Sequence, residues 1–300
     1  MKMTIVDRDD DITHVVLCGR LDTTGADEIG GRFADATTAR QRPAMIDLSA
    51  VGFLASRGIG LLLINAKKLM ATGHKVVLVN PQGLVESVLK TSRVERVLPI
   101  ARDLDEAVQI LRGISGPSSA ASPPVETLAD KSRGQRSEPE SPARSTSDGA
   151  LKLAIKNELS ELTGLNAAVG QFLAVHGVPH RAAYAVNLAI DELVVNVMRY
   201  AYVDDHTHFI EIELAIEGNQ VVLRIVDDGR PFDPRRGPAL DLHAEEREAG
   251  GLGLILVLEM VDVLKYRRMG ESNWVEVRVR LVAEDEQSHL SGARGAADVS

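Results

Sequence analysis

Residues 114–149 divide the chain, because their composition differs from that of the sequence on either side. Five of the twelve prolines of the chain lie in this segment, among many serines. Such a stretch has little apolar surface to bury and cannot build a packed core. The chain has 300 residues, and such a length accommodates about two domains. We therefore predict folded domains at residues 1–113 and 150–283, a disordered linker at 114–149 and a polar tail at 284–300.

The first domain shows alternating strand and helix signals. Short apolar runs, several of them rich in β-branched residues, predict strands at 12–17, 44–48, 75–80 and 97–100. Longer runs that end at glycine or begin near proline predict helices at 25–36, 57–71, 81–91 and 104–111. This alternation is typical of an α/β domain with a mixed sheet.

The second domain has a different order of elements. Two helices are predicted first, at 155–176 and 181–202, followed by strands at 209–216 and 221–226. After an irregular stretch come a helix at 252–263 and strands at 264–269 and 274–281. Helices followed by several antiparallel strands indicate an α/β sandwich with helices on one face of the sheet.

The composition excludes several classes of function. A net charge of −9 argues against direct nucleic-acid binding, which needs a basic surface to displace counterions. A single cysteine rules out an internal disulfide and fits a reducing compartment. The longest apolar run, 252–264, is too short to span a bilayer and contains two carboxylates, and the first residues lack the apolar core of a signal peptide. We expect a cytoplasmic protein without a membrane partner.

A carboxylate and an amide lie on one face of the second predicted helix of this domain. Glu192 and Asn196 are spaced i, i+4, and Arg199 follows near the same stripe. An amide oxygen suits Mg²⁺, a carboxylate can take a proton from an attacking hydroxyl, and an arginine can hold phosphate oxygens. Taken alone, this spacing is more often a solvated helix face.

Two glycine-containing stretches follow at strand and helix ends. Asp227 ends a predicted strand, where its carboxylate can accept a hydrogen bond from the amine of adenine, and Gly229 lets the chain turn past the base. Gly251 and Gly253 open a helix, where backbone N–H groups favour phosphate. The stretch 232–249, which lies between these two glycine-containing stretches, could form a lid. A P-loop motif is missing from the sequence. The order and spacing of these pieces predict a site for ATP and Mg²⁺.

These motifs resemble those of the GHKL (Bergerat) ATPase superfamily over residues 150–283. Residues 192–202 match its N-box, 227–233 its first glycine box and 251–254 its second, and the compact form resembles the anti-sigma-factor serine kinases. The resemblance implies that Asn196 binds Mg²⁺, Glu192 assists an acceptor serine and Asp227 reads adenine. It implies a sigma factor, a separate antagonist protein or both as partners. A homodimer through this domain is an open alternative.

The first domain resembles a STAS domain, the fold of anti-sigma-factor antagonists. The matching stretches are residues 19–22 and 46–60. The resemblance implies that Ser56 is a phosphoacceptor, although Ala55 stands where the family usually has an acidic residue. Ser56 precedes an apolar helix, so the alternative is that it only caps that helix.

These resemblances lead to three hypotheses. The first is a partner-switching regulator of transcription whose serine kinase domain phosphorylates Ser56 in cis or the serine of a separate antagonist. The second is a non-catalytic nucleotide-binding scaffold, and the third is an ATP-hydrolysing conformational machine. Labelling with ATP and Mg²⁺ separates them, because only the first predicts label on a serine.

Overall fold

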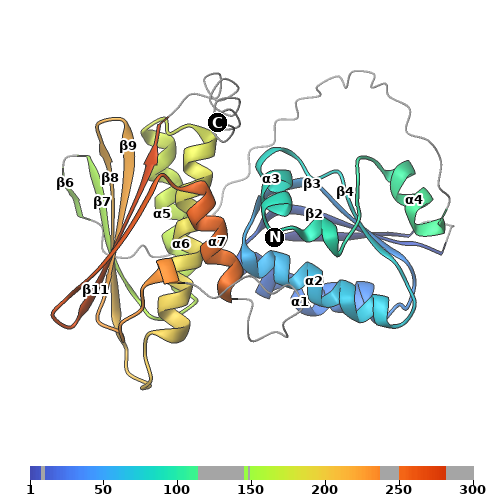
Figure 1. The fold of residues 1–300 in the computed structure, drawn as a ribbon, viewed down its shortest axis with the longest axis horizontal. Helices are drawn as coiled ribbons and strands as arrows, with labels where there is room; N and C mark the ends of the chain where they lie inside the picture. The colour runs from blue at the N-terminus through green and yellow to red at the C-terminus, as the bar shows by residue number, and fades with distance from the viewer. Residues whose placement is uncertain (8–10, 114–144, 148, 237–249, 282–300) are drawn as a thin grey trace, which may run out of the picture.

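The computed structural model describes residues 1–7, 11–113, 145–147, 149–236 and 250–281. These residues form two domains, each built on its own sheet with helices packed against it (Figure 1). The predicted tail and most of the predicted linker lie outside the described residues. One short strand, β6 (Ser145–Ser147), falls inside the range predicted as linker.

The N-terminal domain contains a mixed sheet, as predicted, and the sheet has five strands where four were predicted. Its strands lie in the order β1-β2-β3-β4-β5, with β1 antiparallel to β2 and the other neighbours parallel. The elements are β1 (Lys2–Asp7), β2 (Thr13–Leu21), α1 (Thr23–Thr37), β3 (Ala44–Leu54), α2 (Ser56–Ala71), β4 (Val76–Val79), α3 (Gly83–Thr91), a 3₁₀ turn (Val94–Arg96), β5 (Ile100–Ala101) and α4 (Leu104–Arg112).

Helices cover both faces of this sheet. Successive side chains of a strand point to opposite faces, and the buried residues divide accordingly. Ile46 and Leu78 belong to a core with α1, α2 and α3, whereas Met45 and Val77 pack with α4 on the other face. The near-continuous apolar strands of the sequence thus reflect burial on two sides.

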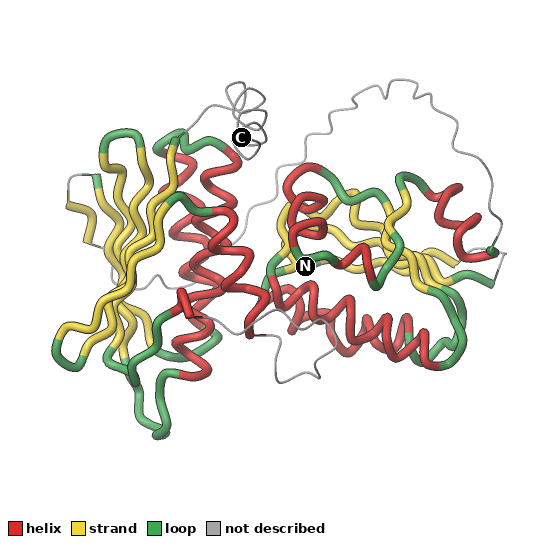
Figure 2. The backbone as a smooth tube through the Cα atoms, viewed as in Figure 1, coloured by secondary structure: helices red, strands yellow, loops and turns green. Residues whose placement is uncertain are grey.

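The C-terminal domain contains a six-stranded antiparallel sheet. Its strands lie in the order β10-β11-β9-β8-β7-β6, and helices α5, α6 and α7 form a layer on one side of it (Figure 2). The remaining elements are β7 (Ala150–Lys156), α5 (Glu161–Val175), α6 (His180–Tyr200), β8 (Phe209–Glu217), β9 (Gln220–Asp227), a 3₁₀ turn (Pro234–Arg236), α7 (Gly250–Met260), β10 (Val263–Met269) and β11 (Ser272–Arg280).

Several predicted element boundaries are wrong. The predicted helix 155–176 begins only at Glu161, because Leu151, Leu153 and Ile155 alternate with exposed residues in strand β7. Strand β1 was not predicted, and β5 is a two-residue strand at 100–101 rather than at 97–100. The predicted strand 97–100 is displaced because a 3₁₀ turn occupies 94–96.

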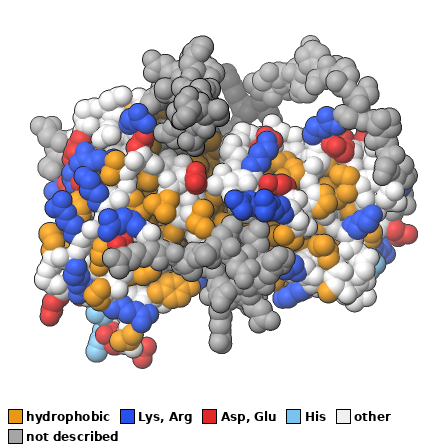
Figure 3. Space-filling view, viewed as in Figure 1, with side chains coloured by type: hydrophobic (Ala, Val, Ile, Leu, Met, Phe, Trp, Pro, Cys, Tyr) orange, Lys and Arg blue, Asp and Glu red, His pale blue; other side chains and the backbone are white. Residues whose placement is uncertain are grey.

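The two domains pack against each other through helices. Helices α2 and α3 contact α7, and one connected cluster of buried apolar residues draws its members from both domains. At the other side of the C-terminal domain, basic and acidic side chains lie interspersed over the end formed by its sheet (Figure 3). Within the described residues, none of the helices is long and apolar enough for a membrane span.

Candidate functional site

Ser56 and Glu192 meet where the two domains touch. The Ser56 hydroxyl donates a hydrogen bond of 2.6 Å to Glu192 Oε2, and the Ser56 backbone N–H donates one of 2.7 Å to Oε1. Ser56 is the first residue of α2, and the N-cap position belongs to Ala55. The alternative that Ser56 only caps its helix is therefore wrong, because its hydroxyl is directed to the other domain.

The carboxylate of Glu192 is held in a confined space. Glu192 is 7% exposed, so its side chain does not lie on a solvated helix face. A Cβ atom on Gly253 would lie 1.9 Å from Glu192 Oε2, so only glycine permits this approach of α7 to α6. Burial raises the pKa of Glu192, and the two hydrogen bonds from Ser56 act in the opposite direction.

Two further contacts hold the domains in register around this pair. The Tyr184 hydroxyl accepts a hydrogen bond from the Leu54 N–H at 3.1 Å and donates one to the Leu54 carbonyl at 2.9 Å. Asp191 Oδ2 accepts from the hydroxyl and N–H of Thr23 at 3.2 and 3.4 Å. Burial, followed by the charges of Glu192 and Asp22, raises the pKa of Asp191 to about 7.

A cavity of about 350 Å³ lies within the C-terminal domain, a size typical of a small-ligand pocket. Asp227 lies in its wall, and Asp227 Oδ1 accepts hydrogen bonds from Gly229 N–H at 3.0 Å and Asn273 Nδ2 at 2.8 Å. Both contacts use Oδ1, so Oδ2 can still accept a bond from a ligand. The cavity is lined by Leu193, Asn196, Val197, Tyr200, Ala201, Ile225, Asp227, Arg230, Pro231, Phe232, Pro234, Asn273 and Val275.

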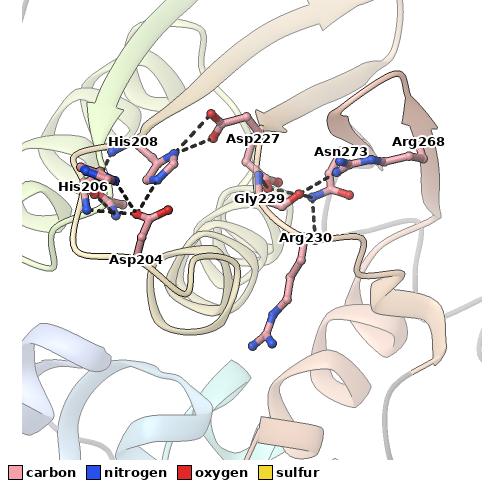
Figure 4. A network of polar contacts seen from close by, with 10 residues as sticks. Asp204, His206, His208, Asp227, Gly229, Arg230, Arg268 and Asn273 are labelled. Atoms are coloured by element: carbon pink, nitrogen blue, oxygen red, sulfur yellow. Dashed lines mark hydrogen bonds and ion pairs between the residues drawn. The ribbon is translucent and has the colours of Figure 1, made fainter.

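Asn273 is a site residue that sequence reasoning missed. Besides Asp227, its Nδ2 donates to the carbonyls of Gly229 and Arg230, and Arg268 also donates to the Gly229 carbonyl (Figure 4). In the sequence Asn273 looks like an ordinary turn residue near the start of a strand. Its role depends on the register that places it opposite Asp227 in the sheet.

A second cavity, of about 570 Å³, opens at the contact between the domains. Ser56, Glu192, Asn196 and Arg199 all line it, and Asn196 lines the first cavity as well. A nucleotide whose base occupied the first cavity could therefore extend its phosphates past Asn196 towards Ser56. Arg199 contacts Asp27 at 4.0 Å, within reach of the same space.

A metal ion at this place would depend on the nucleotide. The described part of the chain holds no group of three or more His, Cys, Asp or Glu side chains arranged for a metal. The amide oxygen of Asn196 is a ligand that Mg²⁺ accepts, and phosphate oxygens and water would supply the others. The donor set fits Mg²⁺ that arrives with ATP.

The remaining candidate residues lie around these cavities. Helix α7 begins at Gly250, two residues before the predicted start, and Gly251 and Gly253 lie in its first turn. Gly229 packs so closely that an added Cβ would lie 2.4 Å from the Cβ of Ala201. Of the stretch predicted as a lid, residues 237–249 lie outside the described residues.

Comparison with known proteins divides the chain in the same way. The family model described as STAS domain matches residues 4–107. The family model described as histidine kinase-like ATPase domain matches residues 155–279. Each of the two resemblances seen in the sequence is thus confirmed in its own part of the chain.

Curated proteins and solved structures are similar to parts of the chain. Serine/threonine-protein kinase BtrW of Bordetella bronchiseptica is 29% identical over 90 residues, or 29% of this chain and 63% of the relative, so the match spans less than two thirds of its length. An anti-sigma-factor antagonist (STAS) domain protein from Planctomyces limnophilus is 23% identical with a TM-score of 0.34, over 36% of this chain and 96% of that one. The RsbU and RsbW domains of a Mycobacterium tuberculosis protein are 19% identical with a TM-score of 0.33, over 44% and 32%.

Proposed function

Because the chain joins a STAS domain to a histidine kinase-like ATPase domain, we propose that it is an ATP-dependent serine kinase that phosphorylates its own Ser56. The observation that carries the proposal is the hydrogen bond of 2.6 Å from the Ser56 hydroxyl to Glu192 Oε2. A base within hydrogen-bond reach of the nucleophile is the geometry that general-base catalysis needs.

The transfer can be written for the residues of the two cavities. Ser56 Oγ attacks the γ-phosphorus of ATP, the new bond is Oγ–P, and the bond to the β-phosphate oxygen breaks and releases ADP. The serine proton passes to the carboxylate of Glu192, whose pKa is raised by burial, so it binds that proton more readily than an exposed glutamate would. Catalysis in phosphoryl transfer is mainly positioning and charge stabilisation, and the hydrogen-bonded Ser56–Glu192 pair supplies positioning of the nucleophile.

The other candidate residues receive binding roles. Asp227 accepts a hydrogen bond from the exocyclic amine of adenine, with Gly229 allowing close approach of the backbone. Asn196 holds Mg²⁺, which when bound neutralises part of the triphosphate charge. Arg199 contacts phosphate oxygens, and N–H groups near Gly251 and Gly253 do the same at the start of α7.

The partners follow from the surface that the STAS domain covers. Its own contact with Glu192 and Tyr184 uses helix α6, so a separate STAS antagonist would compete for the same surface. In this proposal the kinase domain is a regulator by partner switching, with a sigma factor as the second class of partner. Release or capture of that partner depends on whether Ser56 is docked.

The full chain tests the proposal when it is incubated with γ-labelled ATP and Mg²⁺. We expect label on Ser56 in the wild type, and no label in Ser56→Ala or Asn196→Ala. A rate that does not change on dilution identifies transfer within one chain, whereas a rate proportional to concentration identifies transfer between chains.

The scaffold alternative gives a different result in the same assay. It predicts nucleotide binding and domain docking without label on the chain or on added STAS proteins, and the conformational machine predicts steady phosphate release without protein label. Either outcome would reject the kinase proposal.

A further inference from the structure

Asp191 is a buried carboxyl that the proposed transfer does not use. It lies in α6 directly before Glu192, at the contact between the domains, and is 2% exposed. Its Oδ2 accepts two hydrogen bonds, both from Thr23, whereas its Oδ1 is buried without a hydrogen-bond partner among the described residues. Burial of an incompletely bonded carboxyl is costly, so the bonds from Thr23 matter to the docked arrangement.

The neighbouring carboxyls have donors of their own, which leaves Asp191 dependent on Thr23. Asp22 pairs with Arg20 at 2.8 Å, and Glu192 receives two short hydrogen bonds from Ser56. The contacts found for Asp191 in the described chain come from Thr23, the first residue of α1. One hydroxyl and one N–H of the STAS domain therefore stabilise it.

The contact made by Tyr184, unlike that made by Asp191, discriminates little between one STAS domain and another. The Tyr184 hydroxyl bonds the backbone N–H and carbonyl of Leu54, groups that any residue except proline would offer at position 54. Asp191 binds a side-chain hydroxyl, which another STAS domain need not carry. A site built to bond a hydroxyl strongly rejects a ligand that lacks it, because its own polar group is then left unpaired.

We propose that Asp191 is a specificity-determining residue that selects a STAS domain with a hydroxyl at the first residue of its first helix, and so favours the chain's own domain as phosphoacceptor. The proposal deepens the proposed kinase function and rests on it. In this proposal the kinase domain recognises its substrate through Thr23 as well as through the reacting serine.

Hydrogen exchange of the Ser56 amide measures docking without requiring catalysis. In the undocked state this N–H lies at a helix start, where it has no partner within the helix, so its protection reports the docked fraction. We expect Thr23→Val, which keeps the shape of the side chain, to speed exchange at Ser56 about tenfold or more. The matched control is Thr37→Val in the same helix, whose buried hydroxyl bonds Phe33 inside the STAS domain and should leave Ser56 exchange unchanged.

A double substitution separates recognition from a general loss of structure. In Asp191→Leu the unpaired carboxyl is gone, so adding Thr23→Val should change Ser56 exchange less than about twofold, because replacing both partners by apolar groups is nearly neutral. The proposal would be overturned if Thr23→Val changed Ser56 exchange by the same factor in the wild type and in Asp191→Leu. It would also be overturned if Thr23→Val had no effect in the wild type.

Labelling of Ser56 is then measured in the wild type, Thr23→Val, Asp191→Leu and the double variant, and it distinguishes failure of this proposal from failure of the kinase function. If both hold, the rate of label follows the order of Ser56 protection. Coupling in exchange with no label on the wild type would reject the kinase function and with it the role of Asp191 in choosing a phosphoacceptor. Label without coupling would reject only the role of Asp191.

Discussion

Buried carboxyls at two places in the C-terminal domain receive their hydrogen bonds from different sources. At the cavity proposed to bind nucleotide, called here the nucleotide end, Asp227 receives its hydrogen bonds from Gly229 and Asn273 of its own domain. At the contact proposed for phosphoryl transfer, called here the transfer end, Asp191 and Glu192 receive theirs from Thr23 and Ser56 of the STAS domain. Burial raises the pKa of all three carboxyls.

This difference indicates that the ends are completed at different moments. The nucleotide end is built from one domain and can form before docking. The transfer end has its full set of hydrogen bonds only when the STAS domain is docked. Changes at the first end should therefore alter nucleotide affinity, and changes at the second should alter docking or transfer.

The largest expected effect comes from Glu192→Gln. The amide can still accept one hydrogen bond from Ser56 but cannot take its proton, so the rate of Ser56 phosphorylation should fall by about 10²–10⁴. Single-turnover labelling measures the rate, and calorimetry should show nearly unchanged ATP affinity. A labelling rate within a few fold of the wild type would show that Glu192 is not the base.

Gly253→Ala tests whether the transfer end depends on the closeness of α7 and α6. The added Cβ would lie 1.9 Å from Glu192 Oε2, so either α7 or the carboxylate must move, at a cost of about 1–3 kcal/mol. We expect faster exchange of the Ser56 amide and a lower free energy of unfolding.

Gly164→Ala in α5 is the matched control for Gly253→Ala. Apart from its chain neighbours and the backbone of its own helix, no described atom lies within 4 Å of a Cβ there, so the same change should raise the free energy of unfolding by about 0.5–1 kcal/mol. Equal effects of the two substitutions would contradict the steric argument.

Asn273→Ala tests the nucleotide end. It removes the amide that donates to Asp227 Oδ1 at 2.8 Å and leaves buried acceptors with fewer partners, at about 1–3 kcal/mol. ATP affinity measured by calorimetry should fall about five- to hundredfold, while Ser56 exchange without nucleotide stays unchanged. Asn219→Ala, in the exposed turn between β8 and β9, should change neither quantity, and a loss of docking in Asn273→Ala would break the separation of the two ends.

The nucleotide end could be predicted from the sequence further than the transfer end. Asn196 lies four residues after Glu192 in one helix and Asp227 ends a predicted strand, and such local signals are readable without the fold. Asn273 was missed because its contact with Asp227 depends on the register of β9 and β11. Strand β7, in contrast, carried a readable signal in the alternation of Leu151, Leu153 and Ile155.

The transfer end depends on docking, which no local pattern encodes. Thr23 and Asp191 are 168 residues apart in sequence, and Leu54 and Tyr184 are 130 apart. Ser56 could be proposed as an acceptor only by resemblance, and its physical environment alone favoured a helix cap. The structure changes that interpretation by placing its hydroxyl on Glu192.

The smallest expected effect is a pH dependence confined to the transfer end. The pKa of Asp191 is raised to about 7 in the docked chain, so the docked state binds a proton more tightly than an undocked state in which that pKa lies near its ordinary value. Docking is then most favoured below that ordinary value, weakens as the pH rises from there to about 7, and levels off above pH 7, with a change of about tenfold between pH 6 and 8. Protection factors of the Ser56 amide measure this change.

Asp191→Asn should flatten much of that dependence, with a residual slope of the same sign from Glu192, whose pKa is also raised. Protection that increases with pH would contradict the assignment. The proton balance of transfer has the opposite sign, because Glu192 must be ionised to accept the proton of Ser56. Docking falls with pH while the reactivity of the docked pair rises, so the rate of Ser56 labelling should pass through a maximum, and in Asp191→Asn its alkaline limb should become shallower.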